Sequence, residues 1–498
     1  MSEPGASAGR DDLRGGTAWL AGLVALAFAL RLAGAVFQSL HLDDFHTLYH
    51  ARAEGLADFF ARLRQDNHPP LFFLIVKGVR ALCGEAELAL RLPAVLLGTA
   101  TVPLVWRLAR RLPVRAAQVA AAGLVACSSL NLELSVDLRM YSLLTLALTG
   151  LLDALLDVLE GRRGALRVAL WTVVGLHTHY HFVHALAVLG GVALALACLR
   201  AELRPARRPL LGAFAAAALL SVPWYAWGFP AQLAHGLAPG GSAVSPLRLA
   251  EGVVHLVYLN VRLGGAGPRL AFLAAGAVVA GLAAWAALRV VTRARARPGS
   301  ASWLVVVAGA FLLPAWSALA SWLLPRAGFE WRYIAGAVTP LALLAAKGAV
   351  APGALAGARR AALGFALAAA LALCLLNVRD PGREDNRAAV RAILARWRPG
   401  DAVVAAEWQP RLFPHSGAWR FYAPRYLPEG ATLPPLLAHE DDFTFAPGTE
   451  LASFRRVFVL ARSIPDHMPF LMDLRREFVR ETAEPYGMSI WLLTFARE

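Results

Sequence analysis

Residues 41–78, HLDDFHTLYHARAEGLADFFARLRQDNHPPLFFLIVKG, form a polar segment in a chain that is rich in apolar runs. Two adjacent acids, Asp43 and Asp44, stand near its start, and His68 precedes a pair of prolines. The segment follows one apolar run directly, and its last part begins another at Leu71. Whether that second run crosses a membrane decides on which side every later loop lies.

The composition is that of an integral membrane protein. Of 498 residues, 58% are hydrophobic and 17% are charged, and the mean hydropathy is +0.52. Soluble domains are about 25% charged. The apolar runs are continuous rather than alternating, so helices are expected to cross a hydrocarbon layer of about 30 Å. Eleven runs are predicted to span the membrane: residues 18–37, 92–108, 116–133, 140–158, 166–178, 182–199, 210–228, 269–291, 302–324, 333–350 and 361–378.

The run at 71–83 is short for a span and contains Lys77 and Arg80, so it is expected to be a juxtamembrane or re-entrant helix. Basic loops support this choice. If 71–83 does not cross, all of them fall on the N-terminal side, which the positive-inside rule makes the cytoplasm. These loops are 107–115, 160–167, 200–208, 289–299 and the one with Arg359–Arg360. The first run is then an uncleaved anchor.

Two domains follow from this topology. Residues 1–378 are expected to form an α-helical polytopic membrane domain of about eleven spans with juxtamembrane helices, in which 38–90 is one large external loop. Residues 379–498 alternate between helix-like and strand-like segments, such as HMPFLMDLRREFV (467–479) and RRVFVLARS (455–463). This alternation predicts a small extracytoplasmic α/β domain. A lid or scaffold is its expected role, with direct substrate contact as the alternative.

The formal charge of +15 does not indicate a nucleic-acid partner, because the arginines fall mostly in short loops between spans. The cysteines lie in or beside apolar runs without CxxC spacing, so neither disulfides nor a metal knuckle are indicated. They are Cys83, Cys127, Cys198 and Cys374.

The external loop after the first span is the first candidate site. A carboxylate of Asp43 or Asp44 at the membrane surface could act as a general base toward an acceptor hydroxyl or amine. A solvated pair of acids is the alternative, but the loop gathers further polar side chains: His46, His50, Asp66 and His68.

A second outer loop, NLELSVDLRMYS (131–142), carries Glu133, Asp137 and Arg139. Ionisable groups at that depth are costly and are functional candidates. The alternative is that Asp137 and Arg139 pair with each other.

Two further outer segments carry polar groups. GLHTHYHFVHA (175–185) holds four histidines, whose spacing does not place all of them on one helical face, so hydrogen bonding or phosphate contact is favoured over metal binding. RAGFEWRYIAGAVTP (326–340) supplies Arg332, whose fork suits a lipid-linked phosphate. Pairing of Arg332 with Glu330, or anchoring beside Trp331 and Tyr333, is the alternative.

Together these pieces resemble the polytopic GT-C glycosyltransferases of glycosyltransferase family 39, the group of protein O-mannosyltransferases and aminoarabinose transferases. The resemblance covers residues 1 to about 200, with one later anchor at Arg332. Its segments are LDDFHTLYHAR (42–52), DNHPPLFFLIVKG (66–78) with GEAELALRLPAVLLG (84–98), LELSVDLRMYSLL (132–144) with LHTHYHF (176–182), and EWRYIAGAVTPLALLAA (330–346).

The resemblance implies inverting transfer of a sugar from a polyprenyl-phosphate donor to an outward-facing lipid, glycan or protein acceptor. Asp43 would be the catalytic base, supported by Asp44, where the family usually has glutamate. Arg332 would neutralise the departing phosphate. Other residues expected to bind donor phosphate or substrate are His68, Lys77, Asp137, Arg139, Tyr180 and His181. No metal is assigned, because relatives differ in needing one; a divalent cation, if bound, is expected at Asp43 and Asp137.

The sequence thus predicts a hexosyl- or pentosyltransferase of the cell envelope that contacts membrane lipids and is dependent on a polyprenyl-phosphate sugar. Ala- and Arg-rich, Lys-poor usage favours a bacterial inner or plasma membrane, with the N-terminus cytoplasmic and the active site and C-terminal domain outside. A lipid or sugar transporter (a flippase) and a non-catalytic envelope-assembly scaffold are the alternatives. The acids lie at one surface, whereas transporters place ionisable groups near the midplane.

Overall fold

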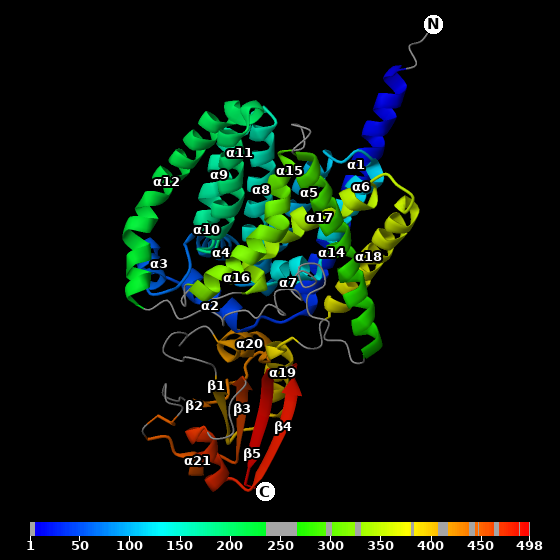
Figure 1. The fold of residues 1–498 in the computed structure, drawn as a ribbon. Helices are drawn as coiled ribbons and strands as arrows, with labels where there is room; N and C mark the ends of the chain where they lie inside the picture. The colour runs from blue at the N-terminus through cyan, green and yellow to red at the C-terminus, as the bar shows by residue number, and fades with distance from the viewer. Residues whose placement is uncertain are drawn as a thin grey trace.

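The computed structural model shows a helical bundle with a small sheet domain at one end (Figure 1). The described residues are 5–235, 266–294, 301–323, 330–379, 383–406, 417–437, 444–446, 448–462, 468–487 and 489–497, and the side chains of 5–14 and 266–269 are outside the description.

The helices of the first half run from the N-terminus to the middle of the bundle. They are α1 (Gly5–Phe37), α2 (Leu42–Ala51), α3 (Leu56–Leu63), α4 (Leu71–Cys83), α5 (Glu87–Ala109), α6 (Arg115–Ala126), α7 (Ser129–Val136), α8 (Tyr141–Leu159), α9 (Ala165–Leu176), α10 (Phe182–Ala185), η1 (Leu186–Gly190), α11 (Gly191–Leu199), η2 (Ala201–Ala206) and α12 (Arg207–Ala234).

The second half completes the bundle and adds the sheet domain. Its bundle helices are α14 (Ala266–Ala294), α15 (Trp303–Val307), η4 (Ala308–Leu312), α16 (Leu313–Leu323), η5 (Trp331–Ala337), α17 (Val338–Ala349) and α18 (Ala356–Asn377). The sheet domain contains α19 (Asn386–Arg396), β1 (Asp401–Ala406), α20 (Ala418–Tyr426), β2 (Leu436–Leu437), η6 (Leu451–Ser453), β3 (Arg456–Arg462), α21 (Pro469–Glu477), β4 (Arg480–Tyr486) and β5 (Ile490–Ala496).

The described residues of the predicted spans are mostly helical, with a break inside 116–133 at Cys127–Ser128. Eight helices of the described residues are long and apolar enough to cross a membrane, or nine if the pair α6 and α7, bent by 45°, is one span. The two other predicted spans are α9 and α17, each of 12 residues. The bend between α6 and α7 falls where the Ser128 hydroxyl accepts from the Asn131 amide and starts a new helix.

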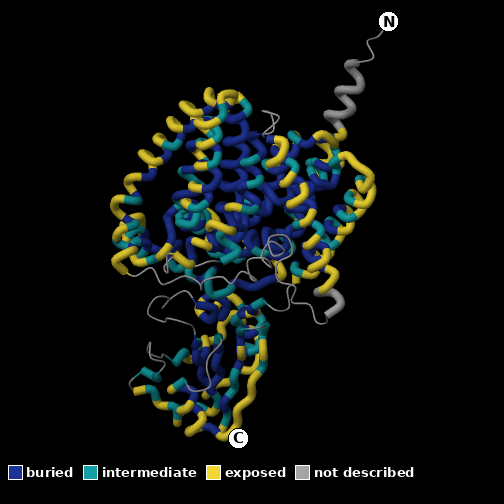
Figure 2. The backbone as a smooth tube through the Cα atoms, viewed as in Figure 1, coloured by how far each residue is buried: buried dark blue, intermediate teal, exposed yellow. Residues whose placement is uncertain are grey.

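Burial separates the helices into a centre and a rim (Figure 2). The apolar window of α8 is wholly buried, whereas those of α1, α12 and α18 are only 28% buried. Apolar side chains such as Leu219 and Leu220 stay exposed on α12. An apolar rim of this kind is what a bundle presents to lipid, where backbone groups must be satisfied within each helix.

The segment 71–83 forms α4, a helix of 13 residues. At about 1.5 Å per residue such a helix is about 20 Å long, short of a hydrocarbon layer of about 30 Å. Since α9 and α17 are as short, length alone does not separate α4 from these two predicted spans, and its juxtamembrane or re-entrant placement stays a prediction.

The described parts of the basic loops lie at the end of the bundle away from the sheet domain (Figure 1). Near the end of α8, Asp153 pairs with Arg107 of α5 (2.7 Å) and with Arg167 of α9 (2.8 Å), which joins the loops at 107–115 and 160–167. Arg200 donates to the Ala294 carbonyl, which joins the loop after α11 to the end of α14. Loops that are remote in the chain thus share one end, as the topology requires.

The sheet domain is built as the alternating pattern predicts. Five strands lie in the order β2-β1-β3-β5-β4, with β1 parallel to β2 and β3, and β5 antiparallel to β3 and β4. A turn at Gly400, with φ +94°, leads from α19 into the buried strand β1. Pattern reasoning missed β4, RETAEPY, whose mostly exposed residues lack the apolar alternation of a half-buried strand.

Reporter fusions test the topology. A cytoplasmic reporter fused near residue 112 should be active and one at residue 400 inactive, because the arginine-rich loops favour the cytoplasmic side. A periplasmic reporter should give the reverse pattern. A fusion near residue 162 is the internal control and should behave like that at 112, since both loops meet at Asp153. Swapped signals would place the sheet domain in the cytoplasm.

Candidate active site

The site begins in the first turn of α2, where Asp43 and Asp44 lie. Acids are favoured there because they face the positive end of the helix dipole. The Asp44 carboxylate also accepts from the His41 amide (3.1 Å), which closes the helix start. Successive residues of a helix point about 100° apart, so the two acids face different surroundings.

Asp44 points into the protein and is fully buried. One of its oxygens accepts from the Leu138 amide (2.7 Å), in the loop between α7 and α8. The other lies 2.9 Å from His41 Nδ1 and 3.5 Å from the guanidinium of Arg91, on α5. Although burial raises the pKa of Asp44, His41 and Arg91 hold it well below its usual range. Asp44 is therefore an internal anchor for the first external loop.

Asp43 points toward the opening instead, and 36% of its side chain is exposed. Its Oδ2 accepts from Arg332 Nη1 at 3.1 Å, so a residue of the first loop meets one just before α17. Burial raises the pKa of Asp43, but the charges of Arg139, His41 and Arg332 hold it well below its usual range. The carboxylate is thus ionised and accessible.

Arg139 lies behind Asp43, with only 3% of its surface exposed. Its Nη1 is 2.9 Å from His46 Nδ1 and 3.4 Å from the Asp43 carbonyl oxygen, and its Nη2 is 3.3 Å from His68 Nε2. The alternative in which Arg139 pairs with Asp137 is not what the structure shows.

Asp137 pairs with Arg383, from the segment that enters the sheet domain. His41 Nε2 is 3.9 Å from the same carboxylate. Sequence reasoning missed Arg383, because nothing in the local pattern of the chain after 379 marks it as a partner for a loop at 137.

The other predicted residues divide into two groups. Tyr180 lies near His68, because its hydroxyl donates to Gln232, whose amide donates to the His68 carbonyl (3.0 Å). Gln232, on α12, is a further residue that the sequence did not single out. Lys77, on α4, instead donates to the Ala53 carbonyl.

Aromatic rings line the approach to Arg332. The guanidinium lies 5.2 Å from the Tyr141 ring centre and 5.8 Å from that of Tyr333. The rings of His181 and Tyr333 pack against each other in a tilted arrangement, with 4.2 Å between their centres. His181, of the histidine-rich segment, therefore lies beside a ring that contacts Arg332, and its role in phosphate binding stays a prediction.

Two groups of described residues have metal-ligand chemistry and spacing: His46, His50 and Asp66, and His41, Asp44 and Asp137. Asp43 belongs to neither group. The expected cation pair, Asp43 and Asp137, is therefore split, with each acid facing its own arginine, Arg332 and Arg383 respectively.

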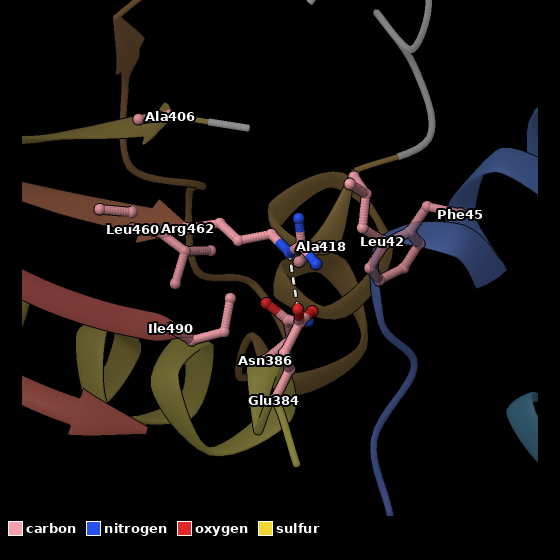
Figure 3. A pocket seen from close by; sticks show the side chains of 10 residues that line it. Leu42, Phe45, Glu384, Asn386, Ala406, Ala418, Leu460, Arg462 and Ile490 are labelled. Atoms are coloured by element: carbon pink, nitrogen blue, oxygen red, sulfur yellow. Dashed lines mark hydrogen bonds and ion pairs between the residues drawn. The ribbon is translucent and has the colours of Figure 1, made fainter. Parts of the chain in front are cut away.

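The sheet domain contacts the start of α2 directly (Figure 3). Leu42 and Phe45 of α2 line a pocket with Ala418 and Arg462 of the domain, where Arg462 pairs with Glu384 at 2.6 Å.

Hydrogen bonds fix the same contact from the loop side. The Tyr422 hydroxyl accepts from the Leu40 amide (2.7 Å), and Asn386 donates to the Leu40 carbonyl (2.9 Å). The backbone of Leu40, in the short link before α2, is thus tied to the domain through both its amide and its carbonyl.

Comparison with known proteins gives one family match. Residues 67–227 match the model of the dolichyl-phosphate-mannose-protein mannosyltransferase family. This region contains the HPP segment, Arg139 and the histidine-rich segment, and it ends within α12. No curated protein matches the chain.

Solved structures show the fold over nearly the whole chain. ArnT from Cupriavidus metallidurans bound to undecaprenyl phosphate aligns with a TM-score of 0.54 and 13% identity, covering 96% of this chain and 98% of ArnT. The apo form of ArnT from the same organism aligns with a TM-score of 0.52 and 14% identity, covering 97% of this chain and 98% of ArnT. The oligosaccharyltransferase AglB from Archaeoglobus fulgidus aligns with a TM-score of only 0.44 and 12% identity, covering 81% of this chain and 63% of AglB. The resemblance to GT-C glycosyltransferases is confirmed, and the chain has the GT-C fold of ArnT.

Substitution of Arg91 tests the anchor. Arg91→Met should lower the free energy of unfolding by about 3–5 kcal/mol, because it removes the buried cation beside the Asp44 carboxylate and the side-chain donor to the carbonyls of Ala35 and Ser39. Thermal unfolding of the purified protein measures the loss. Arg110→Met, at an exposed position of the opposite end, is the matched control and should change stability by less than about 0.5 kcal/mol. Equal melting temperatures for the two variants would contradict the anchor.

Proposed function

We propose that this chain, which has the GT-C fold and a mannosyltransferase-type segment at residues 67–227, is a polyprenyl-phosphate-dependent glycosyltransferase. It would transfer a hexose or pentose to an acceptor on the side of the membrane that carries the sheet domain. The observation that carries the proposal is the 3.1 Å contact between Asp43 and Arg332. A partly exposed base and a partly exposed arginine meet there, in reach of a substrate from outside the bundle.

The cations around Asp43 suit a phosphate. The Nε–H groups of Arg139 and Arg332 are buried and have no hydrogen-bond acceptor among the described residues. Buried donors of this kind are rare unless a ligand or water completes them. Guanidinium groups bind phosphate oxygens through paired N–H donors. ArnT of the same fold holds undecaprenyl phosphate, and we propose a donor of the same class for this chain.

The transfer is a single displacement at the anomeric carbon. The acceptor oxygen or nitrogen forms the new bond to that carbon as its proton passes to the Asp43 carboxylate. The bond between the anomeric carbon and the phosphate oxygen breaks, and polyprenyl phosphate leaves with the electron pair. Arg332 and Arg139 would stabilise the negative charge that develops on the leaving phosphate.

The Asp43–Arg332 pair suggests how the base becomes active. In the free protein the neighbouring cations make the Asp43 carboxylate a weak base, because they hold its pKa well below the usual range. A donor phosphate would compete for Arg332, whose side chain is 37% exposed. Loss of that partner raises the pKa of Asp43 and makes the carboxylate a stronger base when the donor is bound.

The sheet domain would act as a scaffold of this site. Arg383 holds Asp137, and Tyr422 and Asn386 hold the backbone of Leu40, three residues before Asp43. These contacts support a positioning role. Direct contact between the domain and the acceptor is the alternative that the Arg462 pocket beside Leu42 leaves open.

Asp43→Asn tests the base. We expect sugar transfer to fall by about 10²–10⁴-fold, because the amide cannot take the acceptor proton, while expression and membrane insertion persist. The assay offers undecaprenyl-phosphate hexose and pentose donors with a cell-envelope extract and measures release of undecaprenyl phosphate by mass spectrometry.

Glu54→Gln, an exposed acid of the same loop, is the control and should keep full activity. Full activity of the Asp43→Asn variant would remove Asp43 from the mechanism. Movement of the donor lipid across the bilayer without release of undecaprenyl phosphate would favour a transporter.

Arg332→Gln tests the electrostatics through the pH profile. Because the charge of Arg332 lowers the pKa of Asp43, its removal raises that pKa, and activity is lost at higher pH as the base becomes protonated. The acid limb of kcat/KM, which reports the free enzyme, should therefore move to higher pH. Arg139, His41 and His46 remain as cations or potential cations facing Asp43 and keep the shift partial. Arg62→Gln, which removes a cation paired with Asp58, should leave the limb in place. A limb that stays or moves to lower pH would contradict the assignment.

A further inference from the structure

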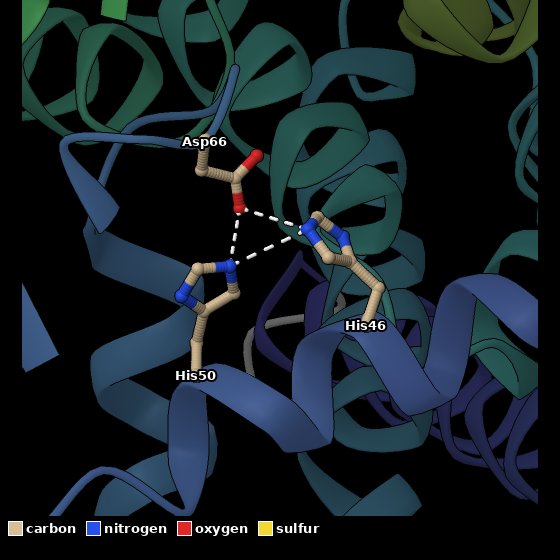
Figure 4. A group of neighbouring side chains, drawn as sticks. All are labelled: His46, His50 and Asp66. Carbon is tan, nitrogen blue, oxygen red and sulfur yellow. Dashed lines mark hydrogen bonds and ion pairs between the residues drawn. The ribbon is translucent and has the colours of Figure 1, made fainter. Parts of the chain in front are cut away.

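A single carboxylate, Asp66, lies behind the histidines that contact Arg139. Its side chain is 2% exposed, in the link between α3 and α4. One oxygen lies 3.0 Å from His46 Nε2 and 2.5 Å from His50 Nε2, and the other lies 3.2 Å from His68 Nδ1. Figure 4 shows His46 and His50, both on α2, pointing at Asp66. The reaction proposed above gives Asp66 no role, so the burial of its carboxylate needs another explanation.

The proton on His46 can be placed from its partners. A guanidinium has only donors, so His46 Nδ1, 2.9 Å from Arg139 Nη1, must present its lone pair. A neutral imidazole then carries its proton on Nε2, which faces Asp66.

His68 follows the same rule with its nitrogens exchanged. Its Nε2 is 3.3 Å from Arg139 Nη2 and must accept, so its proton lies on Nδ1, which faces Asp66. Burial lowers the pKa of His68 to about 4. The hydrogen bond to Asp66 raises this pKa, and the charge of Arg139 lowers it further. A neutral ring is what the geometry requires, since a second proton would face Arg139.

A metal ion at His46, His50 and Asp66 is the competing interpretation, because their three ligand atoms lie 2.5–3.3 Å apart. A metal on His46 Nε2 would need that lone pair and would move the proton to Nδ1. That proton would then face the N–H of Arg139 at 2.9 Å. Ligating histidines normally donate from their other nitrogen to an acceptor, whereas the other nitrogen of His46 meets a donor here.

We propose that Asp66 is a positioning residue for the sugar transfer. Through its hydrogen bond with His68 Nδ1 and the 3.0 Å approach of its other oxygen to His46 Nε2, its negative charge favours the tautomers in which both rings present lone pairs to Arg139. The guanidinium is thereby fixed against the carbonyl of Asp43, where the leaving phosphate is expected. This inference rests on the proposed function, because the position of Arg139 matters only if an anion forms beside it.

Asp66→Asn is the first variant. An amide has one accepting oxygen and one donating NH₂ group, so the NH₂ group of the new side chain would face one of the two histidines. The nitrogen of that histidine must then accept, and its proton moves to the other ring nitrogen, which faces Arg139. We expect kcat to fall by about 10- to 100-fold, as for a catalytic group displaced by about 1 Å. Asp58→Asn, an acid of the same loop paired with Arg62 and 37% exposed, is the matched control and should keep the wild-type kcat.

A second background separates positioning from folding. In a His46→Asn, His68→Gln double variant, amide oxygens can occupy the places of the two accepting nitrogens without help from Asp66. Adding Asp66→Asn there should cost less than about threefold, because coupled residues give non-additive effects. An equal cost in both backgrounds would mean a structural role and would overturn the proposal.

A spectroscopic readout does not depend on activity. Solid-state ¹⁵N NMR of histidine-labelled protein distinguishes the two tautomers, and the His46→Asn and His68→Gln variants assign the signals. Protons on His46 Nε2 and His68 Nδ1 in the wild type, with one of them moved in Asp66→Asn, support the proposal; unchanged tautomers overturn it.

Metal content decides the competing interpretation. One equivalent of zinc bound by the purified protein and lost in His50→Ala would also overturn the tautomer assignment. A wild-type protein that releases no undecaprenyl phosphate refutes the proposed function, whereas an active wild type with a fully active Asp66→Asn variant refutes this inference alone.

Discussion

The rest of the site depends on the hydrogen bonds and charges that surround the buried carboxylate of Asp44. An ionised group in a protein interior costs several kcal/mol unless charges and hydrogen bonds surround it. Asp44 meets that demand with the Leu138 amide, His41 and Arg91, which come from the second outer loop, the helix start and α5. Since none of these partners can leave without exposing the charge, the first turn of α2 has one position. Asp43, the next residue back, is held at the opening as a consequence.

Around this anchor, three arginines have different partners. Arg91 serves Asp44, Arg383 serves Asp137, and Arg139 is held by two histidines and a carbonyl. The Asp43–Arg332 pair differs from these three contacts because both of its side chains are more than one third exposed. Exposed ion pairs contribute little stability, about 0–1 kcal/mol. Exchange of this pair for a charged substrate therefore costs the fold little.

Local sequence patterns predicted the helices and strands well where the apolar residues follow a regular pattern along the segment. Continuous apolar runs marked the spans, and the turn at Gly400 marked the entry into β1. Local patterns failed for β4, an edge strand that contains glutamates and a proline. Its composition does not favour a strand, and it is ordered by its pairing with β5. The break between α6 and α7 was likewise not expected, since a single capping serine interrupts an apolar run without changing its hydropathy.

The sequence by itself determined the class of protein, the helical spans, the loops that share one end, and the polar segments that could meet there. Only the tertiary structure decided the partners within the site. It paired Asp137 with Arg383 rather than Arg139, and it separated the roles of Asp43 and Asp44. The reason is geometric. Neighbouring helical residues point about 100° apart, so two adjacent acids must differ. Which one faces the core, and which arginine reaches it from far along the chain, depends on how the helices pack.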